Sequence, residues 1–297
     1  SGCVRNRGYE LEITATPVLT RDFRWNTTLT WSKNDNKILS LAEGADENQV
    51  ISTVGTASII GRVGGTTGDL WGYKLVRDPE GNVIIGDNGL PEQADEIEYV
   101  GTAYADWKAG WYNEFSYKGF KLGILLDGQV GGTIYSMSFH KMMEQGKLTQ
   151  SLNGRLPGTE YYMDANDPRI AAAGYTPQSG MYMIAPGVVR NDDGTFSPNT
   201  KVVTIESFYK EYYRRANVET NSFDASFLKI REIRLEYELP KKVLEKSPFS
   251  KASIAVYGRN LWCFTDYPLF DPESVALDGS SMVSGIETGS LPTTRTF

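Results

Sequence analysis

The feature that most constrains this chain is a pair of long alternating segments within residues 226–262. In the first segment apolar and charged side chains alternate, which places the two kinds on opposite faces of a β-strand. The apolar face takes Ile233, Leu235, Tyr237 and Leu239, and the polar face takes Glu232, Arg234, Glu236 and Glu238. After Pro240 and a charged turn, with one helical turn expected at 241–246, the chain returns as a second strand through Ile254 and Val256. Strands of about ten residues are roughly twice the usual length, and about ten tilted residues suffice to cross a bilayer.

Two further hairpins of the same kind precede this one. Residues 5–18 and 22–31 alternate on either side of a tight turn at 19–22, and residues 111–118 and 120–130 alternate on either side of Gly119. Their apolar faces carry Tyr9, Leu11, Ile13, Phe23, Trp25, Leu29, Trp31, Phe115, Tyr117, Phe120, Leu122, Ile124 and Leu126. The sequence therefore predicts about six long antiparallel strands in three hairpins.

The connections between the hairpins are very long, whereas those within the hairpins are short. Residues 32–109 and 131–223 are rich in Gly, Asp and Asn, and one small hairpin is expected around Pro79 and short helices at 138–144 and 208–215. Outer-membrane β-barrels combine short turns on one side with long loops on the other. A soluble β-sandwich more often has short loops at both ends, so the pattern favours the barrel.

Composition agrees with either kind of β-protein. The 297 residues have a mean hydropathy of −0.36 and contain no apolar run of about 18 residues, so no transmembrane helix is predicted. Aromatic residues make up 12% of the chain, with 17 Tyr and 6 Trp, which suits membrane interfaces or a soluble protein with sugar-binding surfaces. The net charge of −7 and the absence of a basic stripe argue against nucleic-acid binding.

Six strands are too few to close a membrane barrel, because the smallest known type needs about eight. An open edge in lipid leaves backbone groups without hydrogen bonds. We therefore expect the chain to be part of a larger barrel. Phe297 is aromatic, as the last residue of such barrels often is, but no alternating strand precedes it, so a final strand is also expected to be missing.

Several separate pieces of the chain, in the right order, resemble one family. They are VRNRGYELEI at 4–13, the strand segment at 20–41, WYNEFSYKGFKLGILLDGQVGGTIYS at 111–136, ASFLKIREIRLEYELP at 225–240, YGRNLW at 257–262, DPE at 271–273 and PTTRTF at 292–297. These segments are similar to those of SusC-like (SusC/RagA) TonB-dependent outer-membrane transporters of Bacteroidetes-type bacteria. The resemblance covers essentially the whole chain.

The resemblance implies an all-β fold, namely the C-terminal portion of a 22-stranded transmembrane barrel with long extracellular loops. By that count residues 1–297 hold about strands sixteen to twenty-one, and the plug domain, the TonB box, the earlier strands and the last strand lie outside the chain. The implied function is TonB-dependent import of oligosaccharides or peptides across the outer membrane. The implied partners are a SusD-like surface lipoprotein acting as a lid, the TonB–ExbB–ExbD complex and outer-membrane lipid.

Catalytic chemistry is weakly indicated. His140 is the only histidine, and no carboxylate pair or metal-ligand spacing stands out, so we predict no enzyme activity, no cofactor and no metal. The oxygens of MDANDP at 163–168 could hold Ca²⁺, but the spacing of an EF-hand is absent and a plain turn is the preferred interpretation. The glycines at 61–68 do not join a strand to a helix, which argues against a phosphate-binding loop.

Two groups of side chains are candidates for contact with a transported solute. Aromatic residues of the long loops can stack on sugar rings or meet a lid, although loop packing is the simpler explanation for any one of them: Trp71, Tyr73, Trp107, Tyr161, Tyr162 and Tyr182. Polar strand residues are expected to face the barrel lumen: Arg24, Asn26, Glu232, Arg234 and Glu236. The alternatives are a soluble or surface-attached β-protein that binds glycans without transport, and a hydrolase on a β scaffold.

Overall fold

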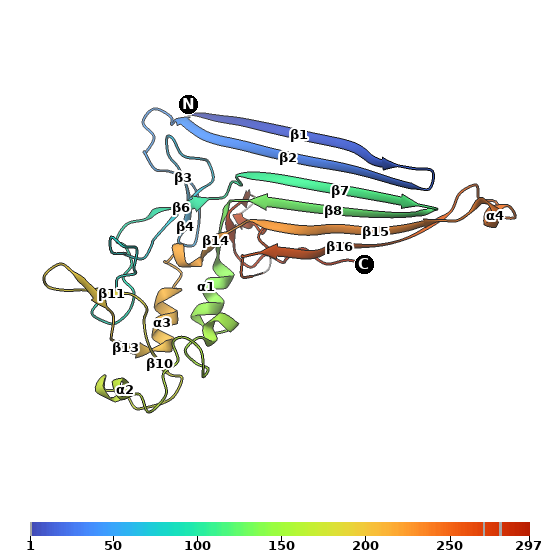
Figure 1. The fold of residues 1–297 in the computed structure, drawn as a ribbon. Helices are drawn as coiled ribbons and strands as arrows, with labels where there is room; N and C mark the ends of the chain where they lie inside the picture. Colours follow the sequence, from blue (N-terminus) through green and yellow to red (C-terminus); the bar gives the residue numbers. More distant parts are fainter. Residues whose placement is uncertain (1, 270, 279–280) are drawn as a thin grey trace.

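The computed structural model describes residues 2–269, 271–278 and 281–297, and its main feature is one long antiparallel sheet (Figure 1). Six strands pair in the order β1-β2-β7-β8-β15-β16. They are β1 (Cys3–Leu19), β2 (Phe23–Ser40), β7 (Trp107–Tyr117), β8 (Phe120–Val130), β15 (Phe227–Glu238) and β16 (Ser253–Thr265). The three predicted hairpins are confirmed, and β1 and β16 form the two edges of the sheet.

The register of the sheet gathers apolar side chains on one face and polar side chains on the other. One apolar row crosses four strands, because Phe115 lies opposite Trp25 and Leu122, and Leu122 lies opposite Leu235. Towards the loop end, a bulge at Arg231 gives β15 one extra residue. After the bulge the odd-numbered residues, such as Ile233, face the apolar side of the sheet. Before it the even-numbered residues Leu228 and Ile230 do so.

The two ends of the sheet differ strongly. At one end the hairpin turns are short, at 20–22 and 118–119, and the connection 239–252 contains α4 (Lys241–Leu244), as expected from the sequence. Lys118 and Gly119 both have positive φ, at 44° and 89°, which is the turn geometry that matches the twist of two paired strands. We call this end, comprising residues 20–22, 118–119 and 239–252, the turn end.

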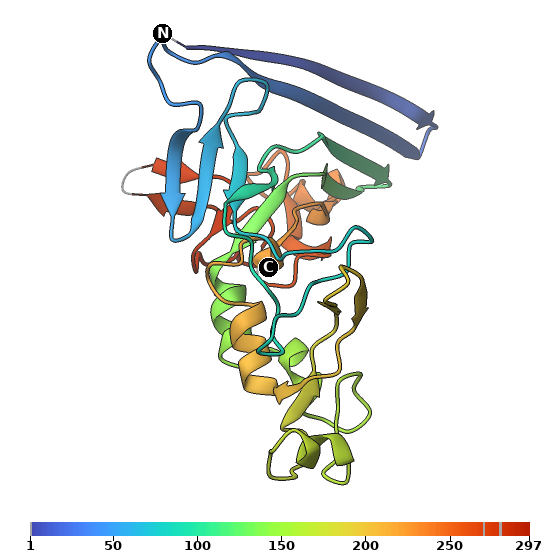
Figure 2. The ribbon, with the colours of Figure 1, turned by 90° about the vertical axis from the view of Figure 1, so that its left-hand side faces the viewer.

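At the other end the long connections fold into a separate layer, which we call the loop layer (residues 41–106, 131–226, 266–269, 271–278 and 281–291; Figures 1 and 2). The chain end then returns to the sheet, where Thr296 pairs with Arg259 of β16. The loop layer holds the sheet β3-β4-β5-β6, the sheet β14-β9-β19 and the strand pairs β10-β13, β11-β12 and β17-β18. The strands are β3 (Gln49–Val54), β4 (Ala57–Gly61), β5 (Asp69–Gly72), β6 (Glu98–Thr102), β9 (Thr133–Ser136), β10 (Tyr182–Ile184), β11 (Val188–Arg190), β12 (Phe196–Pro198), β13 (Val202–Thr204), β14 (Ser222–Asp224), β17 (Ala276–Asp278), β18 (Ser281–Val283) and β19 (Ile286–Glu287). Its helices are α1 (Met137–Glu144), α2 (Pro168–Ala172) and α3 (Ile205–Tyr212), with 3₁₀ turns at Thr149–Leu152 and Glu219–Asn221.

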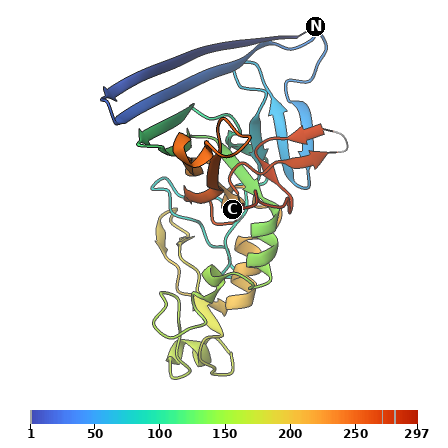
Figure 3. The same cartoon turned by 90° about the vertical axis from the view of Figure 1, so that its right-hand side faces the viewer.

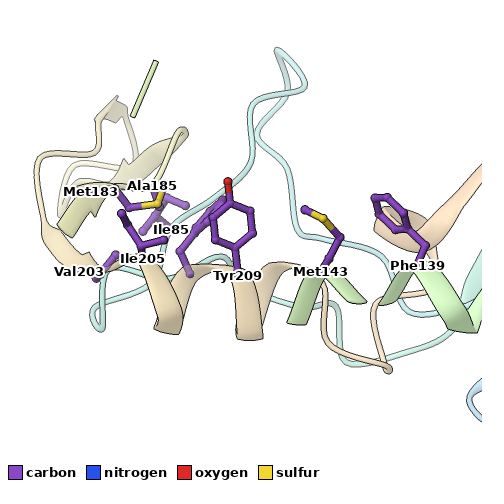
Figure 4. Packing of buried hydrophobic residues seen from close by; sticks show 9 residues of the cluster. Ile85, Phe139, Met143, Met183, Ala185, Val203, Ile205 and Tyr209 are labelled. Atoms are coloured by element: carbon purple, nitrogen blue, oxygen red, sulfur yellow. The ribbon is translucent and has the colours of Figure 1, made fainter. Parts of the chain in front are cut away.

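The buried core of the chain lies mainly in the loop layer. One cluster joins α1 and α3 to β10 and β13 through Phe139, Met143, Met183, Ile205 and Tyr209 (Figure 4). A second cluster joins β4 and β5 to β9 and to the segment that follows β16, which we call the last loop. Leu70, Tyr135, Val218 and Ile286 are among its members. Figure 3 shows the layer extending well beyond the sheet.

Most of the predicted local elements are present, with additions in the loops. The hairpin around Pro79 is confirmed by the pairing of Arg77 with Val83, and the helices expected at 138–144 and 208–215 correspond to α1 and α3. The sheet β3-β4-β5-β6 was not predicted, and neither were the short strands after residue 265. Within the described ranges, no helix is long and apolar enough to cross a membrane.

Candidate functional site

The polar face of the sheet carries all five side chains predicted to face a lumen. Arg24 donates from Nε to Oδ1 of Asn26 at 2.9 Å. Glu232 pairs with Arg259 of β16 at 2.8 Å, and Arg234 pairs with Glu236 at 2.9 Å. The register places these residues on the other face of the sheet from the apolar residues of β2 and β15. The face is therefore a band of paired charges suited to contact with water or a polar solute.

At the loop end of this face lies an ion cluster with a buried pair, Lys229 and Asp271, at its centre and with Arg231, Asp127 and Glu273 more exposed around it. The Lys229 ammonium is 2.7 Å from Oδ1 of Asp271 and also contacts Glu273. Arg231 is 2.6 Å from Asp127 of β8 and 2.7 Å from Glu273. Only 4% of the Lys229 side chain and 6% of the Asp271 side chain are exposed. These ions need one another, because a buried charge without a partner is costly.

The ion cluster fastens the last loop to the sheet. Asp271 and Glu273 belong to the segment that follows β16, and Thr293, near the chain end, donates to Oδ2 of Asp271 at 2.7 Å. Burial alone acts to raise the pKa of Asp271, but hydrogen bonds from Lys229 and Thr293 outweigh it and hold that pKa below its usual value. Ionised Asp271 therefore links the start of the last loop to the segment around Thr293, and both to Lys229 of the sheet.

A second anchor ties the same loop to helix α1. The Glu287 carboxylate is fully buried and accepts hydrogen bonds from Oγ of Ser136 at 2.6 Å and from Oγ of Ser138 at 2.8 Å. Ser136 is also the N-cap of α1, accepting from the backbone N–H of Phe139. A carboxylate at this position is favoured by the positive end of the helix dipole. The last loop is thus part of the loop layer's core.

The apolar face contains polar atoms, and each of two tryptophans satisfies one of them. Trp25 donates from Nε1 to Oδ1 of Asn113 at 2.9 Å, and Trp111 donates from Nε1 to Oγ1 of Thr27 at 2.8 Å. The face is exposed beside these pairs, as at Leu29 (40%) and Trp111 (44%), and most of all on the edge strand β16, as at Ile254 (66%). An exposed apolar surface of this extent marks contact with a membrane or another apolar surface.

Where the polar face meets the loop layer, a polar cavity of about 230 Å³ opens. Its lining includes Lys108 and Gln129 from the sheet, and Glu273 and Ser284 from the last loop. The last loop therefore forms one wall of the space above the polar face.

The six predicted aromatic residues do not form one site. Trp71 lies on β5 with its ring edge against Tyr99 and the Arg62 guanidinium 4.2 Å above it, and Tyr73 follows β5 and pairs with Asn217. The other four lie elsewhere. Trp107 begins β7 and so lies on the sheet rather than in a loop.

Packing explains two of the remaining aromatics. Tyr161 packs against Phe208 of α3, with ring centroids 6.3 Å apart. Tyr182 is buried, packs against the tilted ring of Tyr175 and donates to the carbonyl of Thr176 at 2.8 Å. Tyr162 is half-buried at the surface of the loop layer.

The other candidate groups have structural partners. His140 is buried on α1, with Nδ1 2.7 Å from the carbonyl oxygen of Tyr213 and Nε2 3.5 Å from the Glu144 carboxylate. In the segment 163–168, Asp164 accepts from the backbone N–H of Asn166 and Asp167 caps α2. No group of three or more His, Cys, Asp or Glu residues is arranged for a metal ion in the part of the chain that the structure describes.

Sequence reasoning missed the ion cluster. The motif DPE was noticed, but its role depends on Lys229, which is 42 positions away in the chain. One signal was present, since Lys229 and Arg231 are cations on a strand whose nearby polar positions are mostly acidic. Their placement beside Asp271 is set by the path of the last loop.

No protein-family model matches the chain. Comparison with curated sequences finds similarity to TonB-dependent receptor P3 of Formosa agariphila, 25% identical over all of this chain and 28% of the relative, and to TonB-dependent receptor P26 of the same organism, at 23%. TonB-dependent receptor SusC of Bacteroides thetaiotaomicron is 25% identical over 45% of the chain and 15% of the relative. The chain thus spans little more than a quarter of the length of the first two relatives.

Comparison with solved structures gives the same kind of fold. The RagAB peptide importer in its closed-closed state matches with a TM-score of 0.61, covering 99% of this chain and 29% of that chain at 15% identity. The open-open state of the same importer matches with a TM-score of 0.56 at 14% identity. This likeness supports the fold, part of a large antiparallel barrel with long loops.

Proposed function

Because this chain belongs to the SusC-like TonB-dependent receptors, we propose that it forms one part of an outer-membrane β-barrel that imports oligosaccharides or peptides. The six strands are wall strands, and the loop layer is the extracellular side. The remaining barrel strands and the plug are contributed by the rest of the protein, since the chain spans 28% of the first relatives.

The observation that carries this proposal is the two-sided sheet. Its apolar face is exposed over six strands, and the polar atoms within that face, at Thr27 and Asn113, are hydrogen-bonded by tryptophans. This is what hydrocarbon surroundings require, because an unpaired polar group in lipid is costly. Its other face carries paired charges, as a water-filled lumen allows.

The polar face and the loop layer supply the proposed solute path. Arg24, Asn26, Glu232, Arg234 and Glu236 are proposed to face the lumen or plug. Among the aromatic candidates, we retain Trp71, Tyr73 and Tyr162 as residues that meet the solute or the lid. Trp107 is better placed for lipid contact, Tyr182 is a core residue, and Tyr161 is half-buried and packs against the core.

The proposed partners follow from the family. A SusD-like surface lipoprotein closes over the loop layer, and TonB with ExbB and ExbD supplies energy through segments outside this chain. The solved RagAB structures are of a peptide importer, which supports peptides as a substrate class. Oligosaccharides are proposed from the resemblance to SusC-like transporters.

The test uses the complete native protein. Membrane fractionation and electrophoresis of heated and unheated samples are expected to show outer-membrane localisation and a heat-dependent mobility shift. Uptake of labelled oligosaccharides and of labelled peptides is then compared in cells with and without TonB. A soluble protein without the shift contradicts the proposal and favours a glycan-binding protein without transport.

A further inference from the structure

The turn end carries a positive charge that the chain as a whole does not. The three turns contain six cations, Arg21, Lys118, Lys241, Lys242, Lys246 and Lys251, against the two carboxylates Asp22 and Glu245, in a chain whose net charge is −7. Lys251 pairs with Glu238 at 3.2 Å. Lys241, Lys242 and Lys246 are exposed, and within the described residues they form no ion pair.

The connection that holds most of this charge is longer than a hairpin needs. The other two hairpins turn within 20–22 and 118–119, whereas β15 and β16 are joined by residues 239–252. The connection has internal order, since Leu239 N–H donates to Ala252 at 2.9 Å, Val243 N–H donates to Pro240 at 2.9 Å and Leu244 is buried. It extends past the end of the sheet (Figure 1).

Apolar side chains accompany the lysines in this connection. Val243 and Phe249 are each 64% exposed. A short segment that presents cations and large apolar side chains together suits the boundary between lipid headgroups and acyl chains.

An aromatic row adjoins the turn end on the apolar face. Phe23 lies opposite Tyr117, and Tyr117 lies opposite Phe120. Phe120 in turn contacts Tyr237, with ring centroids 4.4 Å apart. Rows of aromatic side chains mark the level of the headgroups in membrane proteins. The basic turns are therefore just beyond that level, where lysines reach phosphate groups.

We propose that the turn end binds anionic phospholipid headgroups of the leaflet that it faces, with Lys242 and Lys246 as the main contacts. The inference rests on the proposed membrane placement and adds a lipid preference to it. Charge complementarity selects anionic over zwitterionic lipid, and continuity with the apolar face selects a membrane over a soluble anion. The bound headgroups hold the end of the β15–β16 hairpin at the membrane surface.

The experiment compares the full-length protein with two variants in nanodiscs of phosphatidylcholine and phosphatidylglycerol mixed four to one. K242Q/K246Q removes two cations from the turn end, and K141Q/K147Q removes two exposed lysines from the loop layer as a matched control. After extraction into mild detergent, mass spectrometry measures the ratio of the two lipids that remain on the protein.

The wild type is expected to retain phosphatidylglycerol above its share in the disc. K242Q/K246Q is expected to lower this enrichment by about fivefold or more, since each cation near an anionic surface contributes a few-fold. K141Q/K147Q should retain the wild-type ratio, and added salt should weaken the enrichment.

Two results overturn the inference. One is an equal lipid ratio for the wild type and K242Q/K246Q while both insert and show the heat-dependent shift, which leaves the proposed function intact. The other combines two observations: a polyglutamate peptide binds wild type but not K242Q/K246Q in pure phosphatidylcholine discs, and the lipid ratio in the mixed discs is the same for both proteins. This result assigns the surface to an acidic protein segment. A wild type that fails to insert and shows no heat-dependent shift contradicts the membrane placement itself.

Discussion

At the scale of single residues, the tryptophans of the apolar face show how this surface accommodates polar atoms. The Trp25 indole N–H donates a hydrogen bond to the side-chain oxygen of Asn113. The Asn113 side chain is buried among neighbours of β2 and β8. We expect Asn113→Ala to leave Nε1 of Trp25 without an acceptor and to lower the free energy of unfolding by about 1–3 kcal/mol.

Unfolding in detergent or lipid by urea measures this loss. Asn113→Ala combined with Trp25→Phe removes both polar partners, so a double-mutant cycle should show coupling between the two sites. Additive losses from the two single variants are the result that contradicts the pairing.

The ion cluster gives a second prediction at this scale. Lys229→Met leaves the Asp271 carboxylate buried without its main cation, which costs about 3–5 kcal/mol in buried pairs. We expect the last loop to detach, so that limited proteolysis of the intact protein cuts within 271–297 sooner than in the wild type. Lys229→Met with Asp271→Leu removes both charges and should restore much of the resistance. Equal cleavage rates in all three proteins refute the anchoring role.

His140 gives the loop layer a dependence on pH. Burial lowers its pKa below the usual value of about 6.5; the Tyr213 carbonyl and Glu144 oppose this shift, and the charges of Lys141 and Arg215 add to it. The unfolded chain therefore accepts a proton that the folded chain resists. The stability that neutral His140 contributes to the folded state is fully present above about pH 6.5. It is lost as the pH falls towards the lowered pKa of the folded state.

Hydrogen exchange of the α1 amides measures this effect. Exchange is expected to quicken between pH 7 and pH 5 after correction for the intrinsic rate. His140→Asn keeps a donor for the Tyr213 carbonyl and does not titrate, so its exchange should be nearly flat over the same range. Acid-induced opening of equal size in His140→Asn means that another group is responsible.

At the scale of elements, alternation predicted the six strands but not where the parity of a strand changes. Ile233, Leu235 and Tyr237 were correctly placed on one face, yet Leu228 and Ile230 join them only because Arg231 forms a bulge. A bulge is a two-strand property, set by which residue of β8 lies opposite, so the sequence of β15 alone does not reveal it. The same bulge brings Arg231 within reach of Asp127.

The β7–β8 turn is an element that the sequence specifies closely. Gly119 has a φ of 89°, and a Cβ there would lie 3.1 Å from the carbonyl oxygen of Glu238. We expect Gly119→Val to destabilise the hairpin by at least about 1 kcal/mol, whereas Lys118→Gly, at the neighbouring positive φ, should be tolerated. Refolding yield from urea into detergent micelles measures both, and similar yields for the two variants argue against this turn geometry.

At the scale of the whole molecule, the loop layer was the part least accessible from sequence. Two of its helices, α1 and α3, were predicted from local pattern and α2 was not. The contacts that hold the layer are distant, as between Ser136 and Glu287, which are 151 positions apart. Loop composition shows where a chain turns and not which loops meet. For this reason Tyr161 and Tyr182 were among the candidates for ligand contact, and the sequence did not show which of the six aromatics the fold packs.

The orientation of the sheet in a membrane can be tested with tryptophan fluorescence. Trp111 and Trp262 are on the exposed apolar face, whereas Trp71 is in the loop layer. In variants of the full-length protein that keep one tryptophan each, the others being replaced by phenylalanine, lipids brominated on their acyl chains are expected to quench Trp111 and Trp262 strongly and Trp71 weakly. Contact with the quenching atoms requires lipid on the apolar face, so uniform quenching at the three sites contradicts the placement. If Trp111 and Trp262 are both quenched weakly, protein covers this face, and the sheet is then an internal layer rather than a barrel wall.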